Sequence, residues 1–106
     1  MLKKAIWLSY DLGIRGDYKG LYEWLDNHEA KECGDSVAVL IYEVNNNLIE
    51  ELQNDLSEHV KIEQQDRIYL IWLQDNRVKG RFLFGKRKAS AWQGYGSLKT
   101  EPEEDF

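Results

Sequence analysis

The chain has little cysteine, no internal repeat and no long apolar run, and each shortage excludes a class of protein. Cys33 is the one cysteine among 106 residues, so a disulfide within the chain is excluded and a reducing compartment is favoured. No apolar run approaches the ~20 residues that span a bilayer. Asp11 also cuts short the apolar segment that follows Lys3 and Lys4, which argues against a signal peptide. These shortages predict a cytoplasmic protein with one core.

Acidic residues are absent from one long stretch of a chain that is otherwise acidic. The formal net charge is −5, yet residues 76–100 hold seven basic residues and no acidic one. Residues 1–75 hold fifteen acidic against seven basic residues, and residues 101–106 add four acidic ones that we expect to form a solvated tail. Four aromatic residues lie within the basic stretch. Since basic groups neutralise phosphates and aromatic rings stack on bases, this composition is typical of a nucleic-acid or polyanion surface.

The predicted nucleic-acid-binding residues all lie in this stretch: Arg77, Lys79, Arg81, Lys86, Arg87, Lys88, Trp92 and Tyr95. In the alternative interpretation, the segment folds against the acidic body or tail, or is a solubilising tail whose aromatic rings pack on the sheet. Because the whole chain is acidic, any nucleic-acid binding is expected to be local and sensitive to salt.

Apolar runs rich in β-branched and aromatic residues predict the strands. They cover residues 4–12, 36–44 and 67–73, and a weaker run predicts a last strand over residues 78–83. Gly80 within that last run indicates a sheet edge or a bulge. Residues 31–34 predict a break with a very short strand before it. The tryptophans Trp7, Trp24 and Trp72 fall on faces that we expect to be buried.

Two segments carry the apolar spacing of amphipathic helices. Asp17 is the predicted cap of a first helix that buries Tyr18, Leu21, Tyr22 and Leu25. Asn47 is the predicted cap of a second helix, with Glu50 completing a capping box. The second helical face consists of Leu48, Ile49, Leu52 and Leu56.

This order of elements predicts an α+β fold, the ferredoxin-like βαββαβ sandwich. Two amphipathic helices bury their apolar faces on one side of a mostly antiparallel sheet. We expect residues 1–85 to form that single domain, and residues 86–106 to be a basic and aromatic extension with an acidic tail. A sheet of this kind has open edges that can pair with a second copy, so a homodimer is expected.

Asp11 is the predicted catalytic and metal-binding residue, because it ends an apolar strand where a carboxylate needs a partner. The alternative is a capped turn, in which Asp11 accepts bonds from the amides of Gly13 and Ile14. Arg15 and Ser36 are further candidates for phosphate contacts in the loops at strand ends. In the alternative interpretation, Arg15 and Ser36 are solvated residues of connecting loops and contact no phosphate.

The two histidines lie near the ends of the predicted helices, where an imidazole commonly answers the helix dipole. His28, Glu29 and Cys33 do not have the spacing of a zinc site. No metal site is therefore predicted from the histidines.

A first strand that ends in Tyr10-Asp11 and a later strand that opens with Ser36-Val37 resemble the small ferredoxin-like subunit of the CRISPR adaptation complex, CRISPR-associated protein two. The order of the helices between them and the Asp66–Tyr69 strand start fit the same pattern over residues 4–85. This family shares its fold with VapD-type toxin ribonucleases. The resemblance implies a homodimer in which the two Asp11 carboxylates face each other, with Mg²⁺ bound there in members that cut nucleic acid.

The functional prediction is a nucleic-acid-binding protein that, if catalytic, is a metal-dependent endoribonuclease or endonuclease of this type. A non-catalytic protein-interaction or regulatory module with the same fold is the alternative, with the basic segment docking on an acidic partner. A domain that binds a small molecule on the sheet face is a third interpretation.

Overall fold

The computed structural model describes residues 1–96 of the chain. Within that range the elements follow in the order β1 (Leu2–Asp11), α1 (Tyr18–Asn27), β2 (Lys31–Gly34), β3 (Val37–Val44), α2 (Leu48–His59), β4 (Arg67–Gln74) and β5 (Arg77–Phe84). Lys99 and the acidic tail lie outside the described residues. The predicted order of strands and helices is confirmed, and the ends of the four longer strands differ from the prediction by at most two residues. Residues 31–34, predicted as a break after a very short strand, form strand β2 themselves.

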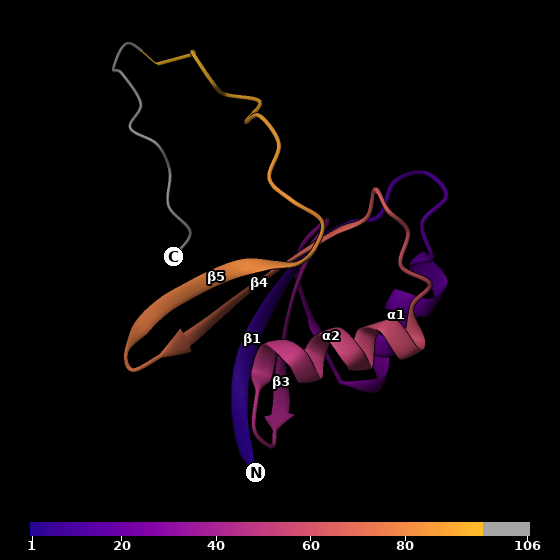
Figure 1. Cartoon of the computed structure of the whole chain (residues 1–106), viewed down its shortest axis with the longest axis vertical. Helices are drawn as coiled ribbons and strands as arrows, with labels where there is room; N and C mark the ends of the chain where they lie inside the picture. Colours follow the sequence, from indigo (N-terminus) through magenta and orange to yellow (C-terminus); the bar gives the residue numbers. More distant parts are fainter. Residues whose placement is uncertain (97–106) are drawn as a thin grey trace.

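All strands join one antiparallel sheet in the order β2-β3-β1-β4-β5 (Figure 1). The central strand β1 pairs with β3 on one side and with β4 on the other. Ile6, Leu8 and Tyr10 alternate along β1 and are buried in the same cluster as the apolar faces of both helices. The helices therefore cover one face of the sheet. The observed architecture is α+β and compatible with the predicted ferredoxin-like fold.

No helix within residues 1–96 lies over the opposite face of the sheet. Trp7 lies on this face and is only half-buried, because strand residues alternate and its neighbours Ile6 and Leu8 take the helix side. The expectation that Trp7 is a core residue is wrong. Trp24 is 1% exposed, as expected, and Trp72 is partly buried against the core.

Helix α2 begins with the predicted cap, but with a different acidic partner. Asn47 Oδ1 accepts a bond from the Glu50 amide at 3.0 Å. The side chain that turns back is Glu51, not Glu50: its carboxylate accepts from the amides of Asn45, Asn46 and Asn47 at 2.9, 2.7 and 2.6 Å. These three bonds stabilise the ionised form and lower the pKa of Glu51. The loop wraps around Glu51, and the capping-box spacing does not anticipate this.

Strands β4 and β5 form a hairpin with a two-residue turn. Asp75 and Asn76 both have positive φ, 51° and 63°, which is the conformation of a type I′ turn. Asn and Asp adopt this region more readily than other non-glycine residues, which suits this dipeptide to the turn. The hairpin makes β5 the edge strand and brings its residues opposite those of β4 in a defined register.

None of the helices in the part of the chain that the structure describes is long and apolar enough to cross a membrane.

Candidate nucleic-acid interface

Asp11, the last residue of β1, lies opposite Arg67, the first residue of β4. Arg67 donates from its guanidinium to Asp11 Oδ2 at 3.3 Å. The carboxylate side chain is 56% exposed and the arginine 28% exposed. Asp11 thus faces an arginine across the sheet, in place of the amides of the following turn. The pair lies on the face of the sheet that the helices leave uncovered.

Tyr69 and Phe82 lie beside this pair on the same face. They are opposite each other in the β4–β5 register, and their rings meet edge to face with centroids 4.8 Å apart. The Arg87 guanidinium lies 5.9 Å from the Tyr69 ring centroid and 5.8 Å from that of Phe82. An arginine at this distance is attracted by the electron-rich faces of both rings.

Two glycines make this arrangement possible. A Cβ on Gly80 would lie 2.6 Å from the Tyr69 hydroxyl oxygen, so only glycine lets the tyrosine ring lie across β5. Gly85 has φ +80°, and a Cβ there would lie 2.6 Å from the Asp66 carbonyl oxygen. The turn at Gly85 directs the chain back so that Arg87 reaches the rings.

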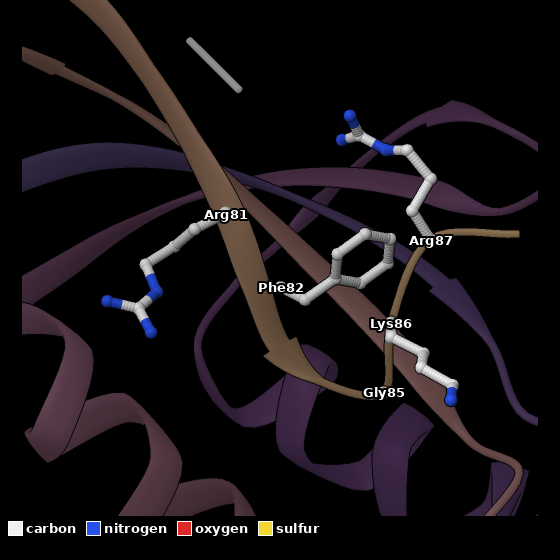
Figure 2. A pocket seen from close by; sticks show the side chains of 5 residues that line it. All are labelled: Arg81, Phe82, Gly85, Lys86 and Arg87. Carbon is white, nitrogen blue, oxygen red and sulfur yellow. The ribbon is translucent and has the colours of Figure 1, made fainter. Parts of the chain in front are cut away.

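These side chains line an open pocket of about 380 Å³. Its lining residues are Ser9, Tyr10, Asp11, Arg67, Tyr69, Ile71, Phe82 and Arg87. A second open pocket of about 500 Å³ shares Phe82 and Arg87 with the first and extends along Gly85 to Arg81 and Lys86 (Figure 2). We call the two together the Tyr69–Phe82 cleft. It combines an aromatic floor with four basic side chains and one carboxylate.

The structure divides the predicted basic residues between two faces of the sheet. Arg77, Lys79 and Arg81 alternate with Val78, Gly80 and Phe82 along β5, so their side chains leave the strand on the other side. Figure 2 shows Arg81 and Phe82 on opposite sides of the strand, with Arg87 on the side of Phe82. Arg81 reaches the cleft around the sheet edge.

The remaining predicted residues lie outside the cleft lining. Lys88 is exposed after β5, and Trp92 and Tyr95 are 68% and 88% exposed. Arg15 is exposed in the turn after β1, and Ser36 accepts a bond from the Tyr10 amide through its carbonyl oxygen at 2.9 Å. Ser36 and Arg15 therefore lie near the same end of β1 as Asp11 without lining the pocket.

Sequence reasoning missed Arg67 and Tyr69 as site residues. Both belong to the apolar run that predicts a strand over residues 67–73, and an apolar run alone does not show which of its side chains are exposed. The signal that could have identified them is the alternation of side chains along a strand. Arg67, Tyr69 and Ile71 occupy alternate positions and share the uncovered face.

The cleft of a single chain does not fit the predicted Mg²⁺. Hard cations take several oxygen ligands, and the pocket lining contains one carboxylate beside two guanidinium groups. A second copy of Asp11 would have to supply a further carboxylate, as the family resemblance implies. The magnesium site stays a prediction that depends on a second copy of the chain.

Comparisons with protein-family models, curated proteins and solved structures find no match, so the resemblance to CRISPR-associated protein two stays a prediction.

Proposed function

We propose that the protein binds nucleic acid and holds an unpaired nucleotide in the Tyr69–Phe82 cleft. The observation that carries the proposal is the Arg87 guanidinium beside two aromatic rings, with Arg67 at the same pocket. A ring face accepts a stacked base, and the two guanidinium groups neutralise the adjoining phosphates. Lys86 and Arg81 extend the basic surface from the pocket along the sheet edge.

The cleft favours single strands over duplexes. In a duplex each base face is covered by its neighbours, whereas an unpaired base can be splayed out and stacked on a protein ring. The Tyr69 and Phe82 rings lie within a concave pocket, which a paired base does not enter without leaving its stack. The chemistry of the cleft does not select between RNA and DNA.

Asp11 acts on this site through Arg67. Its carboxylate holds the guanidinium at the pocket and also repels phosphate, so a bound phosphate would compete with Asp11 for the arginine. The endonuclease activity implied by the family resemblance requires more ligands than one chain offers. It stays a prediction that depends on a second copy.

We infer that β1 to β4 with α1 and α2 form the ferredoxin-like βαββαβ unit and that β5 is added at its edge. The position of β1 between β3 and β4 supports this topology. On the uncovered face, Trp7 and Ile71 adjoin Leu73 and Val78, which are 52% and 51% exposed. This apolar strip supports the proposed homodimer, and it equally favours the alternative function of a protein-interaction module.

Fluorescence anisotropy with a labelled 12-nucleotide single strand tests the binding proposal. Phe82→Leu keeps an apolar side chain but removes a ring, and we expect it to weaken binding by about 5- to 150-fold, the range for one lost stacking contact of ~1–3 kcal/mol. Arg77→Gln removes a charge on the other side of β5 and is the matched control, for which we expect at most a small change.

A duplex of the same sequence should bind more weakly than the single strand, and both complexes should weaken as salt is raised. No binding of any nucleic acid at low salt would reject the proposal in favour of the protein-interaction module. An equal loss of affinity in Phe82→Leu and Arg77→Gln would show that the nucleic acid is bound by the positive charge of β5 and not by the cleft.

A further inference from the structure

A second hollow lies beside the Tyr69–Phe82 cleft on the uncovered face of the sheet. It has a volume of about 420 Å³, close to the 380 Å³ of the pocket that contains Tyr69 and Phe82. Ile71 lines both, so the two hollows adjoin along β4. The lining residues of the second hollow, which we call the Trp7 hollow, are Trp7, Ile71, Trp72, Leu73 and Val78. Groups of similar size can therefore occupy the two hollows.

The sheet register sets the spacing between the hollows. In the pairing of β1 with β4, Ser9 lies opposite Tyr69 and Trp7 lies opposite Ile71. Trp7 and Tyr69 are thus diagonal neighbours, which in antiparallel sheets lie ~7–8 Å apart. Successive bases of a helical strand are only ~3.4 Å apart. Two bases seated at these residues would therefore be parted from each other, and each would need a protein ring in place of its neighbour.

The position of Tyr69 leaves Trp7 uncovered. A Cβ on Gly80 would lie 2.6 Å from the Tyr69 hydroxyl oxygen, so the tyrosine ring leans over β5. Since β1 lies on the other side of β4, the ring leans away from Trp7. Gly80 stands between Val78 and Phe82 on β5, which places the hydroxyl between the two hollows. There it can donate a hydrogen bond to the phosphate or sugar that joins two successive bases.

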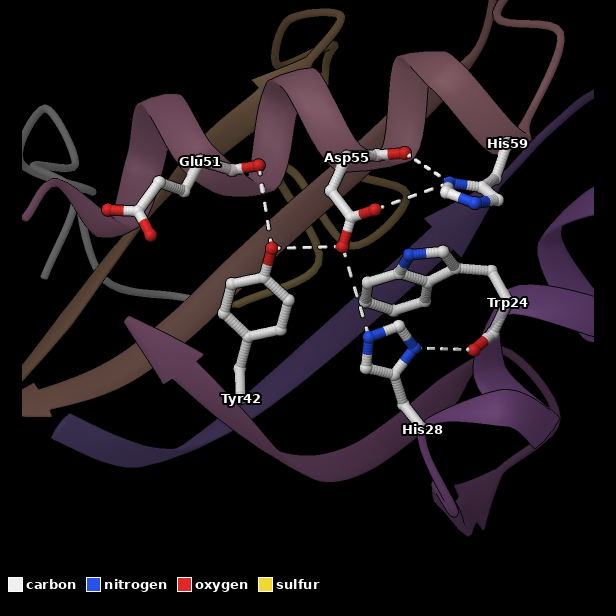
Figure 3. A network of polar contacts seen from close by, with 6 residues as sticks. All are labelled: Trp24, His28, Tyr42, Glu51, Asp55 and His59. Atoms are coloured by element: carbon white, nitrogen blue, oxygen red, sulfur yellow. Dashed lines mark hydrogen bonds and ion pairs between the residues drawn. The ribbon is translucent and has the colours of Figure 1, made fainter. Parts of the chain in front are cut away.

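Trp24, on the helix side of the sheet, shows the contrast with Trp7. Its side chain is 1% exposed, and its ring stacks on His28 with centroids 4.0 Å apart. Tyr42 and Asp55, joined by a hydrogen bond of 2.9 Å, belong to the same cluster (Figure 3). The stacking partner of Trp24 is thus inside the protein, whereas the half-buried Trp7 faces an open hollow.

We propose that the Trp7 hollow is a second base-binding site, in which the nucleotide next to the one in the Tyr69–Phe82 cleft stacks on Trp7. The inference rests on the proposed function of the cleft and names its ligand more closely, as an extended single strand with at least two unpaired nucleotides. RNA-binding sheets use aromatic side chains to stack two or three bases in this way. The lining of the hollow is uncharged and open, so the face of a base is covered while its polar edges stay in water. Little selection between bases is expected.

A second copy of the chain is the competing occupant of this apolar strip. A standard protein interface buries ~800 Å² on each partner. Of the residues that line the hollow, only Leu73 and Val78 are about half-exposed, at 52% and 51%, so the strip alone offers much less area. A homodimer would need further surface, such as the open sheet edges, whereas a single base needs only the hollow.

Competition against the labelled 12-nucleotide single strand tests the inference. Unlabelled thymidine mononucleotide and dinucleotide, each with a 5′-phosphate, displace the labelled strand. The second nucleotide should raise the affinity by about 5- to 150-fold, the range for one stacked base. Trp7→Leu keeps an apolar side chain but removes the ring, so most of this gain should be lost and only the part due to the added phosphate should remain.

Two further variants control this comparison. Trp7→Phe keeps a ring and should keep part of the gain. Trp92→Leu replaces an exposed tryptophan outside both hollows and should keep all of it. Far-UV circular dichroism checks that each variant is folded, and the gain in the unaltered protein needs no variant.

The inference is overturned if the unaltered protein binds the dinucleotide no more tightly than the mononucleotide, or if the gain is the same in Trp7→Leu. It is also overturned if Trp7→Leu converts a dimer to a monomer in sedimentation velocity while the gain persists, since the strip then belongs to a second copy. The proposed function survives these results as long as Phe82→Leu still weakens binding of the 12-nucleotide strand. No binding of that strand at all rejects both.

Discussion

Replacing Gly80 by alanine should damage both the fold and the Tyr69–Phe82 cleft. The added Cβ would lie 2.6 Å from the Tyr69 hydroxyl oxygen, 2.9 Å from Cε2 and 3.1 Å from Cζ. The tyrosine cannot swing away freely, because Phe82 packs on its ring and Arg87 lies beside both. Overpacking of this kind typically costs ~1–3 kcal/mol. For a domain of this size each kcal/mol lowers Tm by ~4–8 °C.

Thermal unfolding followed by circular dichroism measures the stability change, and anisotropy with the labelled single strand measures the loss of binding. Gly96→Ala is the matched control, since a Cβ there meets nothing within 4 Å, and its Tm should stay unchanged. Tyr69→Phe in the Gly80→Ala background removes the atom of closest approach and should recover part of the stability. If Gly80→Ala changes neither Tm nor binding, the account of how Tyr69 is positioned is refuted.

Three further changes have defined outcomes. Leu52→Ala removes a fully buried side chain between helix and sheet and should cost ~2–5 kcal/mol by chemical denaturation; a loss below 1 kcal/mol would contradict the assigned core. The backbone amides of Lys61 and Gly20 donate hydrogen bonds to the Asp17 carboxylate and lower its pKa. The stabilisation that Asp17 contributes is therefore present above the ordinary pKa of 3.8 and is lost as the pH falls through the lower pKa of the folded state. Asp17→Asn should lower Tm at pH 7, and the difference in Tm from the unaltered protein should shrink as the pH is lowered. Asp11→Asn removes a negative charge from the cleft and should strengthen single-strand binding ~2- to 5-fold at low salt. This range corresponds to ~0.4–1 kcal/mol for one exposed charge. Weaker binding by the variant would instead show that Asp11 contacts the nucleic acid directly.

Local patterns in the sequence predicted the elements and their caps well. Asp17 and Asn47 cap the two helices as expected, because an N-cap depends on the side chain and the three residues after it. The Asp75–Asn76 turn follows from the same kind of local preference. Glu51 differs, since its three bonds depend on the path of the preceding loop, which the spacing within the helix does not determine.

The candidate site depends on contacts between distant residues, and these were the hardest to predict. Asp11 was identified from its place at a strand end, but its partner Arg67 follows from the pairing of β1 with β4. Trp7 was misplaced because every position of β1 near it is apolar, and only the one-sided packing of the helices decides which positions are buried.

The basic stretch was recognised from composition but taken as one surface. Alternation along β5 separates Arg77, Lys79 and Arg81 from Phe82, and this information was present in the sequence once a strand was expected there. The return of Arg87 over the rings depends on the turn at Gly85, which composition does not reveal.

Photo-crosslinking tests the central claim most directly. A single strand carrying 5-iodouracil is irradiated in complex with the protein, and the adduct is located by peptide mass spectrometry. Since this base couples to aromatic rings on which it stacks, we predict the adduct at Tyr69 or Phe82 and its loss in competition with an unlabelled single strand. An adduct confined to Trp92 or Tyr95, both exposed outside the cleft, would contradict the account.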